Sequence, residues 1–157
     1  MFSRVLRFVR MPLALLVLWV VIRFILGPVF HTPYAPRGNA MVSVLGLAII
    51  SCLYYGALSR RVGGFGWAGT ILAGAVIGLW AQILIFLATL ISLAAGIETY
   101  FVHWDALNIP EGTHATMAQA MATRAGGLVA GPILGIIMAL IGRAVFSALA
   151  PRCGDEG

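Results

Sequence analysis

The stretch from Gly66 to Glu98 constrains the fold more than any other part of the chain. It carries no charged side chain before its last residue and reads GWAGTILAGAVIGLWAQILIFLATLISLAAGIE. A helix of this length would span about 45–50 Å, whereas the hydrocarbon core of a bilayer is about 30 Å thick. The stretch is too long and too apolar for a soluble protein, and it predicts a helix that crosses a membrane.

The composition agrees with this and limits the number of spans. The chain has 157 residues, of which 61% are hydrophobic and only 10% are charged, whereas a soluble domain carries about 25% charged residues. Apolar runs predict spans at about residues 11–30, 41–59, 67–97 and 117–148, with a polar segment at 98–115. We therefore expect one all-α integral membrane domain, with four transmembrane helices in an up-down-up-down bundle.

The arginine residues predict the orientation in the membrane. Basic residues at one end of the predicted bundle are Arg4, Arg7, Arg10, Arg60, Arg61, Arg143 and Arg152. Only Arg37 and Arg124 fall at the other end, and basic residues favour the cytoplasmic side. We expect a multi-pass protein of a bacterial inner membrane, with both termini in the cytoplasm and with the loop 31–40 and the segment 98–115 outside. Because orientation explains the basic residues, we expect no nucleic acid partner.

Glycine residues recur at a spacing of four on two of the predicted spans. Gly74 and Gly78 share a face of the third span, and Gly127, Gly131 and Gly135 share a face of the fourth. Such faces let membrane helices pack closely. One face can pack inside the bundle and leave the other for a second copy or a larger membrane complex. The leading interpretation is a non-enzymatic structural or accessory subunit, surrounded by membrane lipids.

Two arginines lie in or close to apolar spans. Arg23 falls within the first span, where a charge is costly. It either reaches to lipid phosphate, forms a structural ion pair, or binds an anionic solute or head group. Arg124 lies in an early turn of its helix, where the helix dipole disfavours a cation, so we expect a carboxylate partner, first Glu98 and second Asp105. The expected outer-leaflet charge cluster consists of Arg23, Glu98 and Arg124.

Gln82 lies near the middle of the third span. It predicts either a hydrogen bond between helices or a polar position on a pathway. The alternative function is therefore a solute or ion channel or transporter formed by a homo-oligomer. Its lining would include Gln82, Thr89 and Ser92, with Arg23 or Arg124 selecting anions.

The segment 98–115 carries the other candidates for chemistry. His103, Asp105 and His114 suggest a metal or proton site, but their spacing matches no metal-binding motif such as H-E-x-x-H. The predicted spans contain no Asp, Glu or His, and we expect no catalytic residue, metal or cofactor. A second alternative is a redox or lipid-related membrane subunit that uses this outer face.

Overall fold

The computed structural model describes residues 1–30 and 43–146. The predicted loop 31–40, the start of the second predicted span at Met41, Arg37, and Arg152 in the C-terminal tail lie outside this description. Every regular element in the described residues is helical. In chain order they are α1 (Phe2–Phe30), α2 (Val44–Arg61), α3 (Trp67–Ala95), η2 (Tyr100–Val102), α4 (Trp104–Leu107), α5 (Met117–Ile141) and a π-helical turn, η3 (Gly142–Phe146).

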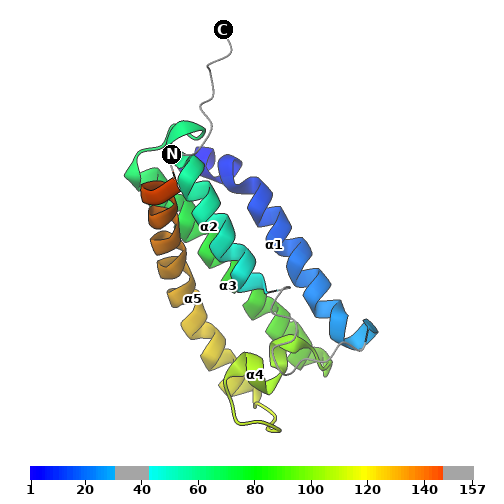
Figure 1. Cartoon of the computed structure of the whole chain (residues 1–157). Helices are drawn as coiled ribbons and strands as arrows, with labels where there is room; N and C mark the ends of the chain where they lie inside the picture. The colour runs from blue at the N-terminus through cyan, green and yellow to red at the C-terminus, as the bar shows by residue number, and fades with distance from the viewer. Residues whose placement is uncertain (31–42, 147–157) are drawn as a thin grey trace.

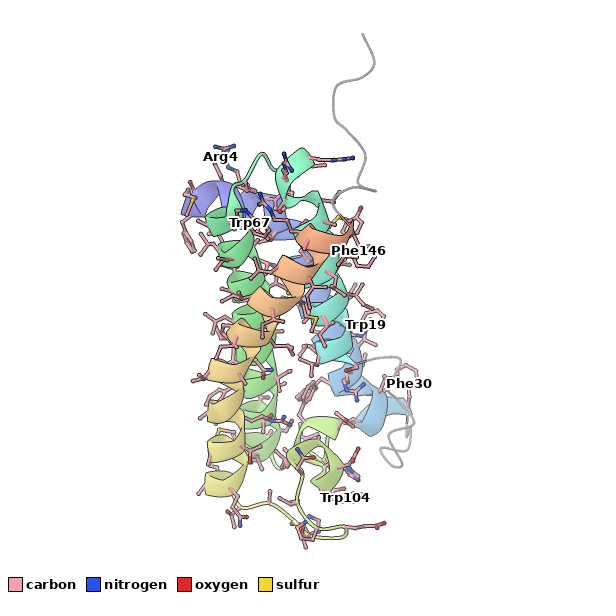
Figure 2. The ribbon with its side chains drawn as sticks, turned by 60° about the vertical axis from the view of Figure 1, so that its left-hand side comes forward. Arg4, Trp19, Phe30, Trp67, Trp104 and Phe146 are labelled. Atoms are coloured by element: carbon pink, nitrogen blue, oxygen red, sulfur yellow. The ribbon has the colours of Figure 1, made fainter. Side chains whose placement is uncertain are left out.

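Three helices are long and apolar enough to cross a membrane. They are α1, α3, and α5 continued by η3 as Met117–Phe146. Exposed apolar side chains cover their outer surfaces, as expected for contact with lipid. Trp67 and Trp104 lie toward opposite ends of the molecule (Figure 2), where membrane proteins concentrate aromatic residues. The prediction of an all-helical chain that fits a membrane is confirmed.

Helix α1 begins nine residues before the predicted span at Met11. The carbonyl of Met1 accepts the backbone N–H groups of Arg4 and Val5, both at 3.1 Å, so the basic N-terminal residues are helical. Val5 and Val9 are fully buried, whereas Arg4 is exposed. The first turns, dark blue in Figure 1, bend away from the rest of α1. Pro12 lies inside the helix and removes a backbone hydrogen bond there.

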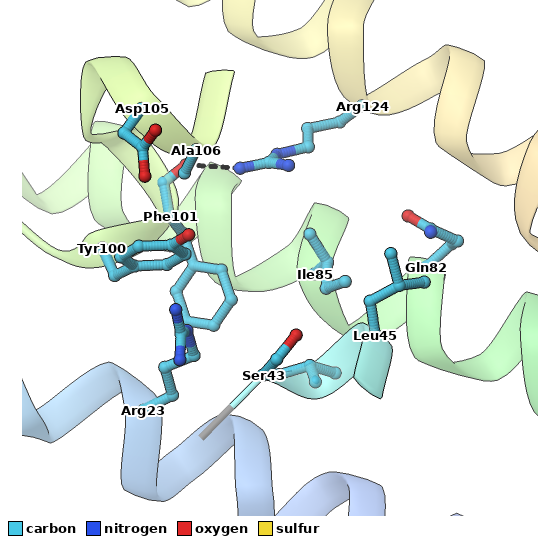
Figure 3. Close-up of a pocket in the computed structure, with 11 residues that line it drawn as sticks. Arg23, Ser43, Leu45, Gln82, Ile85, Tyr100, Phe101, Asp105, Ala106 and Arg124 are labelled. Atoms are coloured by element: carbon cyan, nitrogen blue, oxygen red, sulfur yellow. Dashed lines mark hydrogen bonds between the residues drawn. The ribbon is translucent and has the colours of Figure 1, made fainter. Parts of the chain in front are cut away.

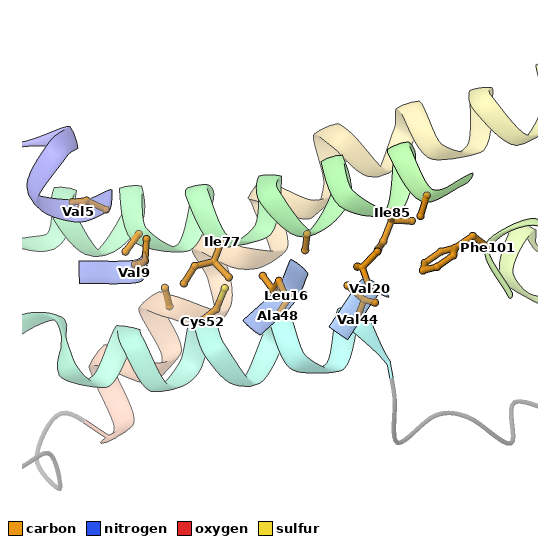
Figure 4. Close-up of a cluster of buried hydrophobic side chains, with 14 of the residues drawn as sticks. Val5, Val9, Leu16, Val20, Val44, Ala48, Cys52, Ile77, Ile85 and Phe101 are labelled. Atoms are coloured by element: carbon orange, nitrogen blue, oxygen red, sulfur yellow. The ribbon is translucent and has the colours of Figure 1, made fainter. Parts of the chain in front are cut away.

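Helix α3 lies at the centre, with α1, α2 and α5 packed around it (Figure 1). The core follows its length and receives side chains from α1 and α2 (Figure 4). Aromatic contacts close both ends of this core. At one end Phe8 packs edge-on against Tyr55 and Phe65. At the other end Phe24 stacks on Phe101, with 6.5 Å between the centres of the two rings.

The two glycine faces pack against each other. A Cβ atom added to Gly74 would lie 2.4 Å from the carbonyl oxygen of Gly135, and one added to Gly78 would lie 2.3 Å from that of Gly131. Only glycine allows the two backbones to come so close. The expectation that one face remains for a second copy is therefore wrong, because the antiparallel register of α3 and α5 brings both faces into the same interface.

Local signals explain where α3 ends and α5 begins. Gly96 adopts φ 64°, a left-handed conformation that glycine tolerates, and its N–H donates to the carbonyls of Ser92 and Leu93. Thr116 caps α5, because its hydroxyl accepts the N–H of Gln119 and the Gln119 side chain accepts the N–H of Thr116. This reciprocal capping box is readable in the sequence as Thr116-x-x-Gln119.

Candidate functional site

A cavity of about 400 Å³ lies between the helices, beneath the segment that carries η2 and α4. Its walls come from α1, α2, α3, η2, α4 and α5, and Figure 3 shows the side chains that line it. The polar residues that line it are Arg23, Ser43, Gln82, Tyr100, Asp105 and Arg124, and the apolar ones are Val44, Leu45, Ile85, Phe101 and Ala106. We call it the arginine cavity. Its lining carries two positive charges and one negative charge.

Arg124 is held by hydrogen bonds from two sides. Its Nε donates to the Thr89 hydroxyl at 3.1 Å, and its Nη2 donates to the Phe101 carbonyl at 2.8 Å. The Thr89 side chain is fully buried and donates in turn to the Ile85 carbonyl at 2.8 Å. The guanidinium therefore ties α5 to α3 and η2. A guanidinium has five N–H donors, and its Nη1 donates no hydrogen bond within residues 1–30 and 43–146.

Arg23 enters the arginine cavity from α1. It is only 5% exposed, and its guanidinium carbon lies 3.7 Å from the centre of the Tyr100 ring. An arginine stacked on an aromatic face is stabilised by the negative charge density of the ring. Figure 3 shows Arg23 against Tyr100 and Phe101, with Arg124 reaching in from the opposite helix.

Buried hydroxyl groups hold η2, which forms the cover of the cavity, in place. The Thr99 and Ser92 hydroxyls lie 2.7 Å apart, and both side chains are 1% exposed. The Thr99 hydroxyl also accepts the N–H of Phe101 at 3.3 Å. After the turn at Gly96, this pair folds the chain back onto the bundle, which buries Phe101 and places Tyr100 over Arg23.

The residues of the expected outer-leaflet charge cluster differ in their relation to the cavity. Arg23 and Arg124 do line the same cavity, but Glu98 is exposed and does not line it. Thr89 and the Phe101 carbonyl occupy the place expected for a carboxylate on Arg124. Glu98 follows the reversal of the chain at Gly96, so it lies beyond the end of α3. Asp105, the second candidate, is the acidic residue that lines the arginine cavity.

Gln82 lies on α3 against the glycine face of α5. A Cβ atom added to Gly131 would come within 2.3 Å of its Cγ, and one added to Gly127 within 2.6 Å of its Oε1. Its amide also lines the arginine cavity. The amide forms no hydrogen bond with any other residue that the structure describes, so the expected interhelical hydrogen bond is absent there.

Two other residues of the expected solute pathway lie elsewhere. Thr89 and Ser92 are buried and do not line the arginine cavity, and their hydroxyls donate to carbonyls of their own helix. Within one chain, Thr89 and Ser92 therefore do not line the cavity that Gln82 lines, and a pathway through an oligomer stays a prediction. Gln82 and Thr89 are seven residues apart and share the face of α3 that meets α5. Thr89 is covered there by Arg124, and the Ser92 hydroxyl lies against that of Thr99.

The candidates for metal binding do not converge. In the described part of the chain, no group of three or more His, Cys, Asp or Glu side chains is placed to hold a metal ion. His114 is exposed, and the His103 ring packs 5.0 Å from the Trp104 ring. Asp105 faces the arginine cavity.

Sequence reasoning missed Arg143. Its position beside an apolar run suggested a basic residue at the membrane surface, but it is only 8% exposed. Its Nη1 donates to the Phe65 carbonyl at 2.9 Å and to the Thr70 hydroxyl at 2.6 Å, and its guanidinium lies 4.4 Å from the centre of the Trp67 ring. The signal that could have found it is its spacing from Arg124, because the buried threonines Thr70 and Thr89 are separated by the same nineteen residues.

Comparisons of the chain with protein-family models, with curated proteins and with solved structures found no match. The chemistry of the site is therefore argued from its own groups. The arginine cavity is lined by two guanidinium groups and by an amide side chain. These groups bind carboxylates and phosphates well.

Proposed function

We propose that this chain is a non-enzymatic protein of the bacterial inner membrane that binds an anionic group in the arginine cavity. Two arginines from different helices supply the positive charge, and Gln82 supplies an amide. The observation that carries the proposal is that Arg23 and Arg124 line one cavity of about 400 Å³. Charge-assisted hydrogen bonds from a guanidinium are about twice as strong as neutral ones, which makes an anion the favoured occupant.

The proposal includes a bundle of four spans in up-down-up-down order. Helix α2 has 18 residues, which correspond to about 27 Å of helix and nearly cross a hydrocarbon core of about 30 Å. It ends in Arg60 and Arg61, which suit a cytoplasmic interface. The arrangement puts both termini in the cytoplasm and the arginine cavity in the outer half of the membrane.

Self-association through the glycine faces is not part of the proposal, because those faces meet within one chain. A larger membrane complex stays a prediction from the sequence. The alternative function, a solute or ion pathway, would use the same cavity as an entrance. The two functions differ in one measurable property, since a binding protein holds its anion without passing it across the membrane.

The test is to purify the protein from native membranes in a mild detergent and to measure the mass of the intact assembly. We expect the chain to carry a small anionic molecule that is lost in the Arg23→Gln variant. The exposed Arg10, at the other end of α1, provides the matched control as Arg10→Gln. Anion flux in liposomes that depends on Gln82 would overturn the proposal in favour of a pathway, and wild-type protein without any bound anion would contradict it directly.

A further inference from the structure

We infer that the occupant of the arginine cavity is the head group of an anionic phospholipid, which enters from the bilayer beside α2. This inference rests on the proposed binding of an anion and names its class. The shared chemistry is a phosphate, which free inorganic phosphate could also supply. Three features favour the lipid: the depth of Arg124, the opening of the cavity, and the apolar seam next to it.

The depth follows from two matching contacts between α3 and α5. Arg124 bonds Thr89 at one end and Arg143 bonds Thr70 at the other. The two arginines are nineteen residues apart, and so are the two threonines. Nineteen residues of helix rise about 29 Å, close to the thickness of about 30 Å for the hydrocarbon core. Arg143 lies against Trp67, an aromatic residue that suits the inner interface. With Arg143 at that interface, the spacing puts Arg124 at the outer boundary, within reach of lipid phosphates.

The cavity opens on the side of α2. Leu45 lines the arginine cavity and is also 41% exposed, so it forms part of the mouth. Ser43 and Val44 line the same wall. A lipid that diffuses in the plane of the bilayer meets this mouth without leaving the apolar phase, whereas a soluble ion must enter from water.

An apolar seam continues from Leu45 toward the middle of the bundle. It is lined by residues of α2, α3 and α5 that include Ala48, Ala81, Gly131 and Leu134. Its volume is only about 10 Å³, room for no more than one water molecule. An acyl chain would therefore lie across its outer edge, with the tails in the bilayer and the phosphate between the arginines.

The donors in the cavity match a phosphate diester. Arg124 uses Nε and Nη2 for protein contacts, which fixes the guanidinium and leaves Nη1 for a ligand oxygen. The Gln82 amide lines the same space from α3. A neutral head group such as phosphocholine carries its own cation, which the net positive lining of the cavity would repel.

The experiment uses the full-length protein, stripped of lipid in a neutral detergent, and native mass spectrometry. The probes are phosphatidylglycerol, phosphatidylcholine and inorganic phosphate. We expect one phosphatidylglycerol molecule to bind per chain. The affinity for phosphatidylcholine should be lower by about tenfold or more. Arg124→Gln should lower the affinity for phosphatidylglycerol by about the same factor. The matched control, Arg143→Gln, removes the equivalent contact on the same helix and should keep the lipid affinity.

A second variant separates the lipid from free phosphate and does not depend on the folding of the arginine variants. Leu45→Trp fills the mouth of the cavity and should lower phosphatidylglycerol binding, and Ile50→Trp on the exposed face of α2 should not. Binding of inorganic phosphate without phosphatidylglycerol, or lipid binding unchanged by Leu45→Trp, would overturn the lipid inference and leave anion binding standing. Equal binding of both lipids, or no binding of any probe, would overturn both proposals.

Discussion

Arg143 donates a hydrogen bond of 2.6 Å to the Thr70 hydroxyl, inside the bundle and far along α3 from the arginine cavity. The Thr70 hydroxyl also lies 2.8 Å from that of Ser59, so the contact joins α2, α3 and the end of α5. Arg124 and Thr89 repeat the pair at the other end of the same two helices. Between the two pairs lies the glycine interface, so the helices are clamped at both ends of their closest approach.

The contact between Arg143 and Thr70, which we call the inner clamp, predicts a large loss of stability in Arg143→Gln. The variant loses two hydrogen bonds from a charged donor, to Thr70 and to the Phe65 carbonyl. A loss of about 2 kcal/mol in the free energy of unfolding is expected. Thermal unfolding in detergent measures it, with Arg60→Gln, an exposed position at the same end, as the control. Equal stability of the two variants would show that the clamp contributes nothing.

The glycine interface predicts opposite effects at two glycines of α5, one inside the interface and one outside it. In Gly135→Ala the new Cβ would meet the carbonyl oxygen of Gly74 at 2.2 Å, and backbone atoms on both sides leave no side chain to move. The helices must separate, at a cost of about 1–3 kcal/mol. Gly126→Ala is the matched control, because nothing lies within 4 Å of its Cβ position, and alanine favours helix by up to about 1 kcal/mol. A melting temperature for Gly135→Ala at or above that of Gly126→Ala would contradict the predicted packing.

The sequence predicted an all-helical membrane chain because the signals of long apolar helices are local. The apolar run of α3 and the capping box at Thr116 are properties of neighbouring residues. The pairing of the two glycine faces was not predicted, since each face alone is equally suited to a helix of the same chain or of another. Deciding between them requires the register of α3 against α5, which no single helix encodes.

The arginine cavity itself was not predicted, for a similar reason. The apolar surroundings of Arg23 and Arg124 marked both as residues that need partners. A carboxylate was expected beside Arg124, yet Arg124 bonds a threonine hydroxyl and a backbone carbonyl. The contact of Arg23 with the Tyr100 ring was not expected. A carbonyl acceptor has no signature in the sequence, and the position of Tyr100 depends on how the chain turns at Gly96.

The change in the expected partner of Arg124 reverses a prediction about Glu98. With Glu98 as the partner, Glu98→Gln would destabilise the fold about as much as Arg124→Gln. Because Glu98 is exposed, we now expect Glu98→Gln to change the free energy of unfolding by no more than about 1 kcal/mol. Arg124→Gln, which loses two hydrogen bonds from a charged donor, should cost about 2 kcal/mol. Thermal unfolding of the two variants side by side measures the difference, and equal losses would restore Glu98 as the partner.

The proposed orientation predicts which loops react with a reagent that cannot cross the membrane. A background without Cys52 and Cys153 receives a single cysteine, either Thr113→Cys between α4 and α5 or Val62→Cys between α2 and α3. Both positions are exposed. In spheroplasts, a charged maleimide should label the first at once and the second only after the membrane is permeabilised. The reverse pattern would invert the topology, and labelling of both would mean that α3 does not separate these loops as proposed.

The hydroxyl pair under η2 predicts a coupling between stability and binding. Thr99→Val keeps the shape of the side chain but loses the contact with Ser92 and the N–H of Phe101, and it leaves the buried Phe101 N–H without this acceptor, at a cost of about 1–3 kcal/mol. Since Tyr100 and Phe101 line the arginine cavity, phosphatidylglycerol should also dissociate faster from this variant. Thr113→Val, at an exposed hydroxyl in the same segment, is the control. A variant that melts earlier but binds the lipid as tightly as wild type would show that the cover plays no part in holding the head group.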